Sequence, residues 1–268
     1  MRPEGERYTH GFHDVVVSAH ARRTAEDCAA FLLPRLDPDA FVLDVGCGPG
    51  TITVGLARYS GRVIGLDAES SVLAVASSHA RDEGVENVGF EVGSAYDLRW
   101  PDDTFDVVWA HQLLQHLADP RSALREFRRV LKPGGSVAVR DSDFGTMVHA
   151  PIEPAIERWL ELYHRVTAAN GGEADAGRHL LSWVIDAGFM DAETSSATWT
   201  YADPDRRAEW GELWAVRITE GSFADHAIDN GLADRAEIDE MAAAFRRWAT
   251  RRAGFWAFIH GQVLALAP

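Results

Sequence analysis

Five short apolar runs alternate with helical segments in the first half of the chain, and this alternation constrains the fold more than any other feature. The runs occupy residues 41–45, 62–67, 88–92, 105–110 and 136–141. Helix-forming segments lie between them, and the helix expected at 121–131 stops at the sequence KPGG. This order predicts βαβ units, and therefore a parallel sheet with helices on both faces.

The pattern changes after residue 143. Residues 151–169, 178–187 and 203–250, with a break near Gly231, have helical character, whereas 191–201 and the C-terminal run from 255 resemble strands. Near the N-terminus, residues 10–36 read as a helix that Pro34 and Pro38 end. We therefore expect an α/β fold with a doubly wound, Rossmann-like and mostly parallel sheet of seven strands.

The domain organisation follows from the absence of a Pro- or Ser-rich linker. We expect one domain over residues 1–268. Its parts are an N-terminal helical lid at 1–36, a ligand-binding core at 37–143 and the C-terminal half of the sheet at 144–268. Helical insertions are expected at about 144–175 and 203–250.

The composition of the chain limits the classes of binding partner and the cellular location that we expect. The 26 basic and 41 acidic residues give a net charge of −15, which opposes binding to nucleic acid. No run of about 18 apolar residues is present, so no membrane span is expected. The N-terminal residues lack the apolar centre of a secretory signal, and two cysteines cannot form a disulfide framework. These features predict a cytoplasmic protein.

A metal site is not expected. His10, His13 and His20 are close in sequence. No cysteine or carboxylate completes a plausible ligand set at suitable spacing.

The segment DVGCGPG at residues 44–50 joins the first apolar run to the next helix. Glycines there permit a tight turn and the close approach of a ligand, and ligands of open α/β sheets bind at this edge. Asp67 ends the second run, 21 residues after Gly46, where an acid accepts hydrogen bonds from ribose hydroxyls. The two features predict a site for a ligand that contains ribose.

The glycine spacing argues against a dinucleotide. The dinucleotide fingerprint is G-x-G-x-x-G/A, whereas Gly50 gives G-x-G-x-G and Thr51 stands where a small residue is needed. Pro49 lacks an N–H donor, and Asp44 would repel a pyrophosphate but attract a cation. A nicotinamide oxidoreductase is therefore disfavoured. S-adenosylmethionine fits, because it combines adenosine with a sulfonium and an amino-acid tail.

With these motifs the chain resembles class I S-adenosylmethionine-dependent methyltransferases. It is most similar to the branch that includes ubiquinone and menaquinone biosynthesis enzymes and natural-product methyltransferases. The resemblance covers about residues 40–141 and rests on VLDVGCGPG, VIGLD, the segment 93–117 and LKPGGSVAV, in that order. It implies a seven-stranded sheet with the last strand antiparallel, and S-adenosylhomocysteine as the product.

The resemblance also implies a cofactor site. Asp67 is expected on the ribose, Ala68 against adenine, and Ser94 where the family often has an acid that holds the adenine amino group. Tyr8 or Arg23 is expected to meet the cofactor carboxylate beneath the lid. The cofactor-binding residues expected are Tyr8, Arg23, Asp44, Gly46, Cys47, Gly48, Gly50, Asp67, Ala68, Ser94, Ala95 and His111.

Methyl transfer needs little catalytic machinery, because the cofactor already carries the activated group. A base is required only if the acceptor must lose a proton early. His111 is the catalytic candidate, although a structural or backbone role competes with it. His116 is expected to be a helix residue that packs or hydrogen-bonds locally. Asp141 and Asp143 either orient the acceptor or cap a loop.

The acceptor is expected to contact the segments outside the shared core. Trp210, Trp214, Arg217 and Phe223 lie there, and an aromatic cavity suits a planar or apolar small molecule. Simple packing of amphipathic helices is the competing explanation. The eleven acids and four arginines from Asp203 to Glu240 oppose an anionic macromolecule as substrate.

The sequence thus predicts methyl transfer from S-adenosylmethionine to a small organic acceptor, at oxygen or carbon rather than nitrogen. Two alternatives stay open. One is an S-adenosylmethionine-binding protein that acts as a scaffold or catalyses a non-methylating reaction, and the other is a methyltransferase for protein or RNA. Monomer and homodimer are both compatible with the sequence.

Overall fold

A seven-stranded sheet organises the computed structural model, which describes residues 6–9 and 22–268. Its strand order is β3-β2-β1-β4-β5-β7-β6. The strands are β1 (Phe41–Val45), β2 (Arg62–Asp67), β3 (Val88–Val92), β4 (Phe105–His111), β5 (Leu131–Ala150), β6 (Met190–Tyr201) and β7 (Phe255–Leu266). Strands β1 to β5 pair in parallel, and β7 is antiparallel to both β5 and β6. The predicted sheet, including its antiparallel last strand, is confirmed.

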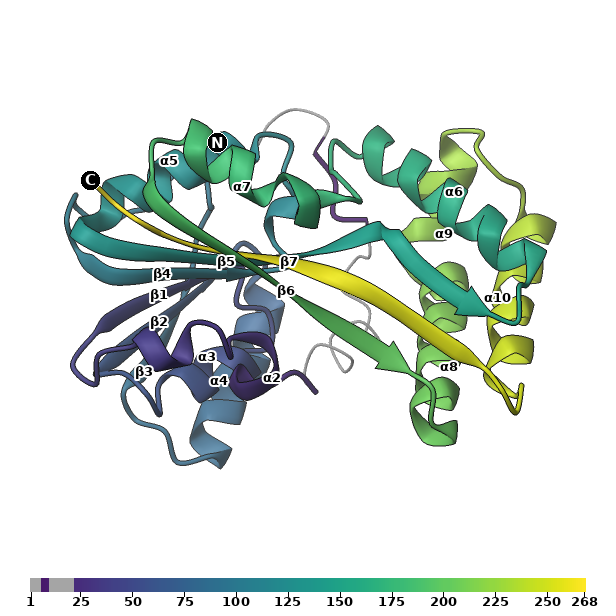
Figure 1. Ribbon diagram of the computed structural model, residues 1–268, viewed down its shortest axis with the longest axis horizontal. Helices are drawn as coiled ribbons and strands as arrows, with labels where there is room; N and C mark the ends of the chain where they lie inside the picture. The colour runs from purple at the N-terminus through teal and green to yellow at the C-terminus, as the bar shows by residue number, and fades with distance from the viewer. Residues whose placement is uncertain (1–5, 10–21) are drawn as a thin grey trace.

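Helices cover both faces of this sheet, as predicted (Figure 1). One face carries α2 (Ala25–Cys28), α3 (Thr51–Leu56) and α4 (Ser70–Asp82), and the other carries α5 (Pro120–Val130) and α7 (Ala176–Asp186). Two short 3-10 helices, η1 (Leu33–Arg35) and η2 (Leu114–His116), complete this part.

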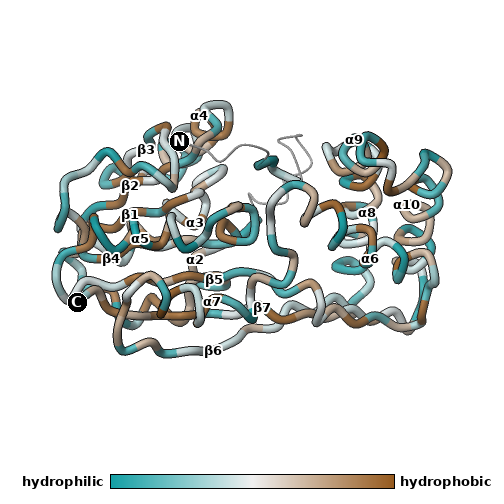
Figure 2. Tube along the Cα trace, turned by 90° about the horizontal axis from the view of Figure 1, so that it is seen from above, coloured by the Kyte–Doolittle hydropathy of each residue, from teal (hydrophilic) through white to brown (hydrophobic). Residues whose placement is uncertain are grey.

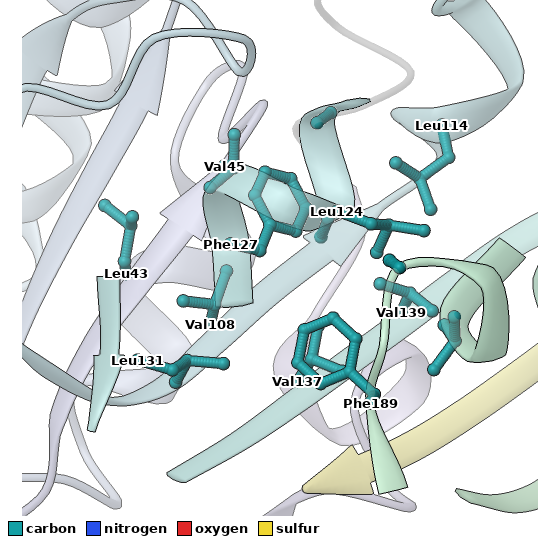
Figure 3. Close-up of a cluster of buried hydrophobic side chains, with 14 of the residues drawn as sticks. Leu43, Val45, Val108, Leu114, Leu124, Phe127, Leu131, Val137, Val139 and Phe189 are labelled. Carbon is teal, nitrogen blue, oxygen red and sulfur yellow. The ribbon is translucent and has the colours of Figure 1, made fainter. Parts of the chain in front are cut away.

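Helix α5 illustrates how local sequence and burial agree. Asp119 caps its first turn by accepting from the amide of Ser122 at 2.9 Å, and Pro120 at the first position needs no hydrogen-bond partner for its nitrogen. Its apolar face, which includes Leu124 and Phe127, is buried against β4 and β5 in the cluster of Figure 3. This packing fixes the sheet from which the ligand-binding loops extend.

Four helices form a separate layer at one end of the molecule. They are α6 (Pro154–Ala169), α8 (Pro204–Glu220), α9 (Ser222–Asp229) and α10 (Arg235–Ala249). Figures 1 and 2 show this group joined to the rest by the long strands β5, β6 and β7. A second hydrophobic cluster, rich in tryptophan, fills the space between the helices and the strands. No described helix is both long and apolar enough to cross a membrane.

Strand β5 is longer than the predicted run at 136–141. It continues to Ala150, although its pairing with β7 is interrupted between Asp143 and Val148. At the interruption the hydroxyl of Thr146 accepts from the amide of Ile259 at 2.9 Å. The helical insertion expected at about 144–175 is therefore wrong for its first residues, because β5 continues to Ala150 and the helix α6 (Pro154–Ala169) begins only after it.

The helix predicted at 10–36 is wrong for its described part. Residues 10–21 lie outside the described residues, and 22–36 contain only α2 and η1. Thr24 caps α2 by accepting from the amide of Asp27, and Ala25 packs onto Gly55 of α3 so closely that a Cβ on Gly55 would lie 2.7 Å from the Cβ of Ala25. The conformation of residues 22–36 is therefore determined by packing against α3 rather than by helical periodicity.

The region predicted as helical at 203–250 is also more divided than expected. It contains three helices, because the chain turns at Gly221 as well as near Gly231.

Candidate functional site

Two cavities adjoin at the carboxyl ends of the central strands. The smaller, of about 250 Å³, lies at the ends of β1, β2 and β4, where the strand order reverses and α/β sheets bind ligands. The larger, of about 1180 Å³, lies between β5, β6 and α8. Arg23, Gln112 and His116 line both. A ligand in one cavity can therefore approach a ligand in the other at these three residues.

The smaller cavity contains nearly all the predicted cofactor residues. Those that line it are Tyr8, Arg23, Asp44, Gly46, Cys47, Gly48, Asp67, Ala68, Ser94, Ala95 and His111. Gly50 is the exception. A Cβ there would lie 2.6 Å from the Cβ of Ala76 and 3.0 Å from the ring of Phe90, so Gly50 permits close packing of α3 rather than contact with a ligand.

The glycine loop leaves backbone open to the cavity. Gly46 and Gly48 have φ of +77° and +53°, which favour glycine. A Cβ on Gly46 would come within 2.9 Å of the Leu113 side chain, whereas nothing lies within 4 Å of a Cβ on Gly48. The amide of Gly48 donates to Asp67 Oδ2 at 2.9 Å and the amide of Glu69 to Asp67 Oδ1 at 3.0 Å. The Asp67 carboxylate is thus held in a fixed orientation at the cavity wall.

Asp44 supplies a second carboxyl group beneath the loop. Its Oδ2 accepts from the Thr53 hydroxyl at 2.6 Å. Burial, with a smaller contribution from the charge of Asp67, raises the pKa of Asp44 to about 7. Burial also raises the pKa of Asp67. A cationic ligand would favour the ionised forms of both groups.

Tyr8 and Arg23 also line the smaller cavity. The Tyr8 ring meets the His116 ring edge-on at a centroid distance of 4.7 Å, and burial raises the pKa of Tyr8 to about 12. The Arg23 guanidinium lies 5.6 Å from the centre of the Trp199 ring, and burial lowers its pKa. A phenol that stays protonated and a guanidinium can both donate to an anionic group.

His111 is buried at the end of β4 and contacts an arginine. Its Nε2 lies 3.2 Å from Arg140 Nη1. Because arginine only donates, Nε2 is the acceptor of this hydrogen bond. This contact opposes the general-base role considered for His111, since Nε2 is engaged and its protonation would face a positive charge.

The two carboxylates that follow in β5 line neither cavity. Asp143 forms a two-pronged ion pair with Arg178 at 2.7 and 2.5 Å. Asp141 is fully buried, accepts from the amide of Gln115 at 3.4 Å, and has its pKa raised to about 8 by burial. Of the two roles considered for Asp141 and Asp143, these contacts fit the structural one. Because neither side chain lines a cavity, neither is in a position to orient the methyl acceptor.

Aromatic side chains surround the larger cavity. They are Phe144, Trp199, Tyr201, Trp210, Trp214 and Phe258, and Arg217 lies among them. Trp210, Trp214 and Arg217 therefore occupy the predicted position. Phe223 does not, because it is buried against Tyr163 at a ring distance of 6.0 Å.

Two positions at these cavities were not anticipated from the sequence. His116, expected to pack or hydrogen-bond locally, does contact its neighbour, with its Nε2 3.0 Å from Gln115 Nε2, but it also lines both cavities. Trp199 has two guanidinium groups near its ring, that of Arg23 at 5.6 Å and that of Arg140 at 5.1 Å from the ring centre. The alternating pattern at 191–201 predicted that Trp199 lies in a strand, but the sequence did not predict that this strand, β6, pairs at the edge of the sheet.

No group of three or more potential metal ligands occurs among the described residues. His10, His13 and His20 lie outside them.

Comparison with known proteins gives a consistent result. Residues 36–197 match the "Methyltransferase domain" family. An uncharacterized methyltransferase of Schizosaccharomyces pombe is 34% identical over 96% of this chain and 95% of its own length. The 27-O-demethylrifamycin SV methyltransferase of Amycolatopsis mediterranei is 35% identical over 51% of this chain and 52% of its own.

The fold is shared with a solved structure. The YcgJ protein of Bacillus subtilis superposes with a TM-score of 0.58 at 21% identity, covering 88% of this chain and 96% of that one. A match across more than half the chain and a full-length relative above 30% identity together establish the family. The chain belongs to the methyltransferase-domain family and is a class I methyltransferase that uses S-adenosylmethionine.

Proposed function

We propose that this enzyme methylates a small organic molecule bound in the larger cavity, at oxygen or carbon rather than nitrogen. The observation that carries the proposal is the wall shared by the two cavities, formed by Arg23, Gln112 and His116. This shared wall supports a donor site in the smaller cavity next to an aromatic acceptor site in the larger one. The relative named for 27-O-demethylrifamycin supports an oxygen acceptor.

In this proposal the smaller cavity holds the cofactor. The Asp67 carboxylate binds the ribose hydroxyls, and Ala68, Ser94 and Ala95 border the adenine. The open backbone at Gly48 fits a ligand that approaches the loop closely, since nothing lies within 4 Å of a Cβ there. Gly46 and Cys47 complete the loop.

The remaining residues are assigned to the amino-acid end of the cofactor. Tyr8 and Arg23 donate to the carboxylate, and Asp44 attracts the positive charges. His111 contributes by its position at the end of β4.

Transfer takes place at the shared wall. When bound, S-adenosylmethionine would supply a methyl group activated by a positively charged sulfur, for displacement by the acceptor atom with the neutral thioether as leaving group. Gln112 is fixed there by an unusual backbone φ of +52° and by contact of its Nε2 with His260 Nε2 at 2.9 Å. Gln112 and His116 thereby hold the acceptor atom against the methyl group, which is catalysis by positioning.

The ionisation of Asp44 gives a pH test of the cofactor site. Because the folded-state pKa is about 7 instead of 3.8, the carboxyl group loses its proton as the pH rises through 7, and the ionised form attracts the ligand ammonium. We expect the affinity for S-adenosylhomocysteine to increase between pH 6 and pH 8. Titration calorimetry of Asp44→Asn should show a flat profile over this range. An identical slope in Asp44→Asn would assign the titration to another group.

The function itself is tested with labelled cofactor. The enzyme is incubated with trideuteromethyl S-adenosylmethionine and an extract separated by size into metabolites and macromolecules. We expect the deuterated methyl group in the metabolite fraction, detected by mass spectrometry, and much less of it with an Asp67→Ala control at cofactor concentrations that do not saturate the variant. Label confined to protein or RNA would contradict the proposal.

A further inference from the structure

We infer that the acceptor is an aromatic molecule with an oxyanion, a carboxylate or a phosphate, that binds to Arg217 in the wall of the larger cavity. The inference rests on the proposed function and specifies its substrate class. Arg217 lies on α8, in the helical layer outside the cofactor core.

The first support is that Arg217 is buried and that two of its guanidinium nitrogens have no hydrogen-bond partner in the part of the chain that the structure describes. Its side chain is only 7% exposed. Among residues 6–9 and 22–268, neither Nε nor Nη2 finds a hydrogen-bond partner, and no acid forms an ion pair with the Arg217 guanidinium. Its guanidinium lies 5.3 Å from the centre of the Trp214 ring. A buried charge is unfavourable unless it is paired, so this position is suited to an anion from outside.

The charges around Arg217 are the second support. Burial, followed by repulsion from Arg23, lowers the pKa of Arg217 to about 10. It therefore stays positively charged at neutral pH, and so does Arg23 in the same cavity.

The acids of the cavity do not cancel these two charges. Glu209 pairs with Arg22 at 2.9 Å and Glu212 pairs with Arg246 at 2.8 Å. Asp27 is the remaining lining carboxylate among the described residues. The positive charge facing the cavity thus exceeds the negative charge.

The shape of the guanidinium and the walls defines the ligand class. A planar guanidinium matches a carboxylate or phosphate with two parallel hydrogen bonds. Tyr201, Trp210 and Phe258 line the same cavity, and an aromatic ring packs on such side chains in offset or edge-on geometry. An acidic aromatic molecule uses both features.

Arg217 is distinguished from a cofactor ligand by its location. It lines the larger cavity and is not among the residues of the smaller one, whereas Arg23 lines both. Arg23 is therefore available to the cofactor carboxylate and Arg217 to the acceptor.

The test compares matched probes on enzyme saturated with S-adenosylhomocysteine. Naphthoate is compared with naphthamide, and naphthyl phosphate with naphthol, by quenching of tryptophan fluorescence. We expect at least one anion to bind about tenfold or more tightly than its neutral counterpart, since hydrogen bonds to charged groups are the strong ones. The two pairs distinguish a carboxylate from a phosphate acceptor.

Variants then locate the effect. Arg217→Met should remove the preference for the anion, and Arg217→Lys should keep part of it. Arg206→Met is the matched control, because Arg206 lines the same cavity but is exposed and packs on Tyr201. It should retain the preference. The Lys variant keeps the test valid if the Met variant does not fold.

Three results would overturn the inference. They are equal binding of anions and neutral probes, a preference that survives in both Arg217 variants, and a loss of S-adenosylhomocysteine affinity in Arg217→Lys equal to the loss of probe affinity. In contrast, failure of the wild-type enzyme to methylate any small molecule would contradict the proposed function, whatever the probes do.

Discussion

Asp67→Ala is expected to weaken S-adenosylhomocysteine binding by about 10- to 150-fold, because hydrogen bonds to a charged group are worth about 1.5–3 kcal/mol. Two backbone amides, of Gly48 and Glu69, hold the carboxylate in place. Each oxygen still has acceptor capacity for a ribose hydroxyl. Titration calorimetry measures the loss directly.

A matched control separates this effect from a general loss of acidic charge. Asp82 is exposed at the end of α4, the helix that follows Asp67. Asp82→Ala should bind like the wild type. An unchanged dissociation constant in Asp67→Ala would remove Asp67 from the cofactor site.

A distorted glycine loop is the competing explanation for a loss of affinity, because Asp67→Ala also leaves the amide of Gly48 without its hydrogen-bond acceptor. Asp67→Asn addresses it by keeping one acceptor oxygen and the size of the side chain. We expect Asp67→Asn to lose less affinity than Asp67→Ala. The thermal unfolding midpoint of each variant reports any damage to the fold.

The sheet and the smaller cavity were predictable because short-range patterns encode them. Each central strand is a short apolar run, and the DVGCGPG segment joins β1 to α3 with backbone angles that favour glycine at Gly46, Gly48 and Gly50. Parallel strands place their carboxyl ends at one edge. Asp44 and Asp67, 23 residues apart, therefore meet at one cavity.

The larger cavity was not predictable in the same way. Its wall combines Arg23 near the N-terminus, Trp199 of β6 and Arg217 of α8, which no sequence period relates. Their proximity depends on β7 returning between β5 and β6. The positive φ of Gln112 likewise has no signal in the sequence, because glutamine rarely adopts it.

The aromatic cluster of the helical layer is built around five buried tryptophans, Trp159, Trp210, Trp214, Trp248 and Trp256. Trp159 is fully buried at its centre. Its ring lies 4.5 Å from Trp214, 4.9 Å from Phe245 and 6.2 Å from Trp256. Trp214 in turn lines the larger cavity. The packing of this cluster therefore sets the position of a cavity wall.

Trp159→Ala is expected to lower the free energy of unfolding by about 3–5 kcal/mol, because it removes a buried ring and leaves a cavity. Chemical denaturation followed by circular dichroism measures this change. Ile185→Ala on α7 is the control, since Ile185 is 55% exposed and its loss should change the free energy by no more than about 0.5 kcal/mol.

The same experiment tests whether the chain is one folding unit. Strands β5 and β7 contribute to both hydrophobic clusters, with Val137 and Val263 in the sheet cluster and Phe144 and Phe258 in the helical one. We propose that these shared strands couple the two clusters, so that residues 1–268 form a single domain. Trp159→Ala should then shift one cooperative transition as a whole. A second transition, with only part of the signal shifted, would mean that the helical layer unfolds independently of the cofactor-binding sheet.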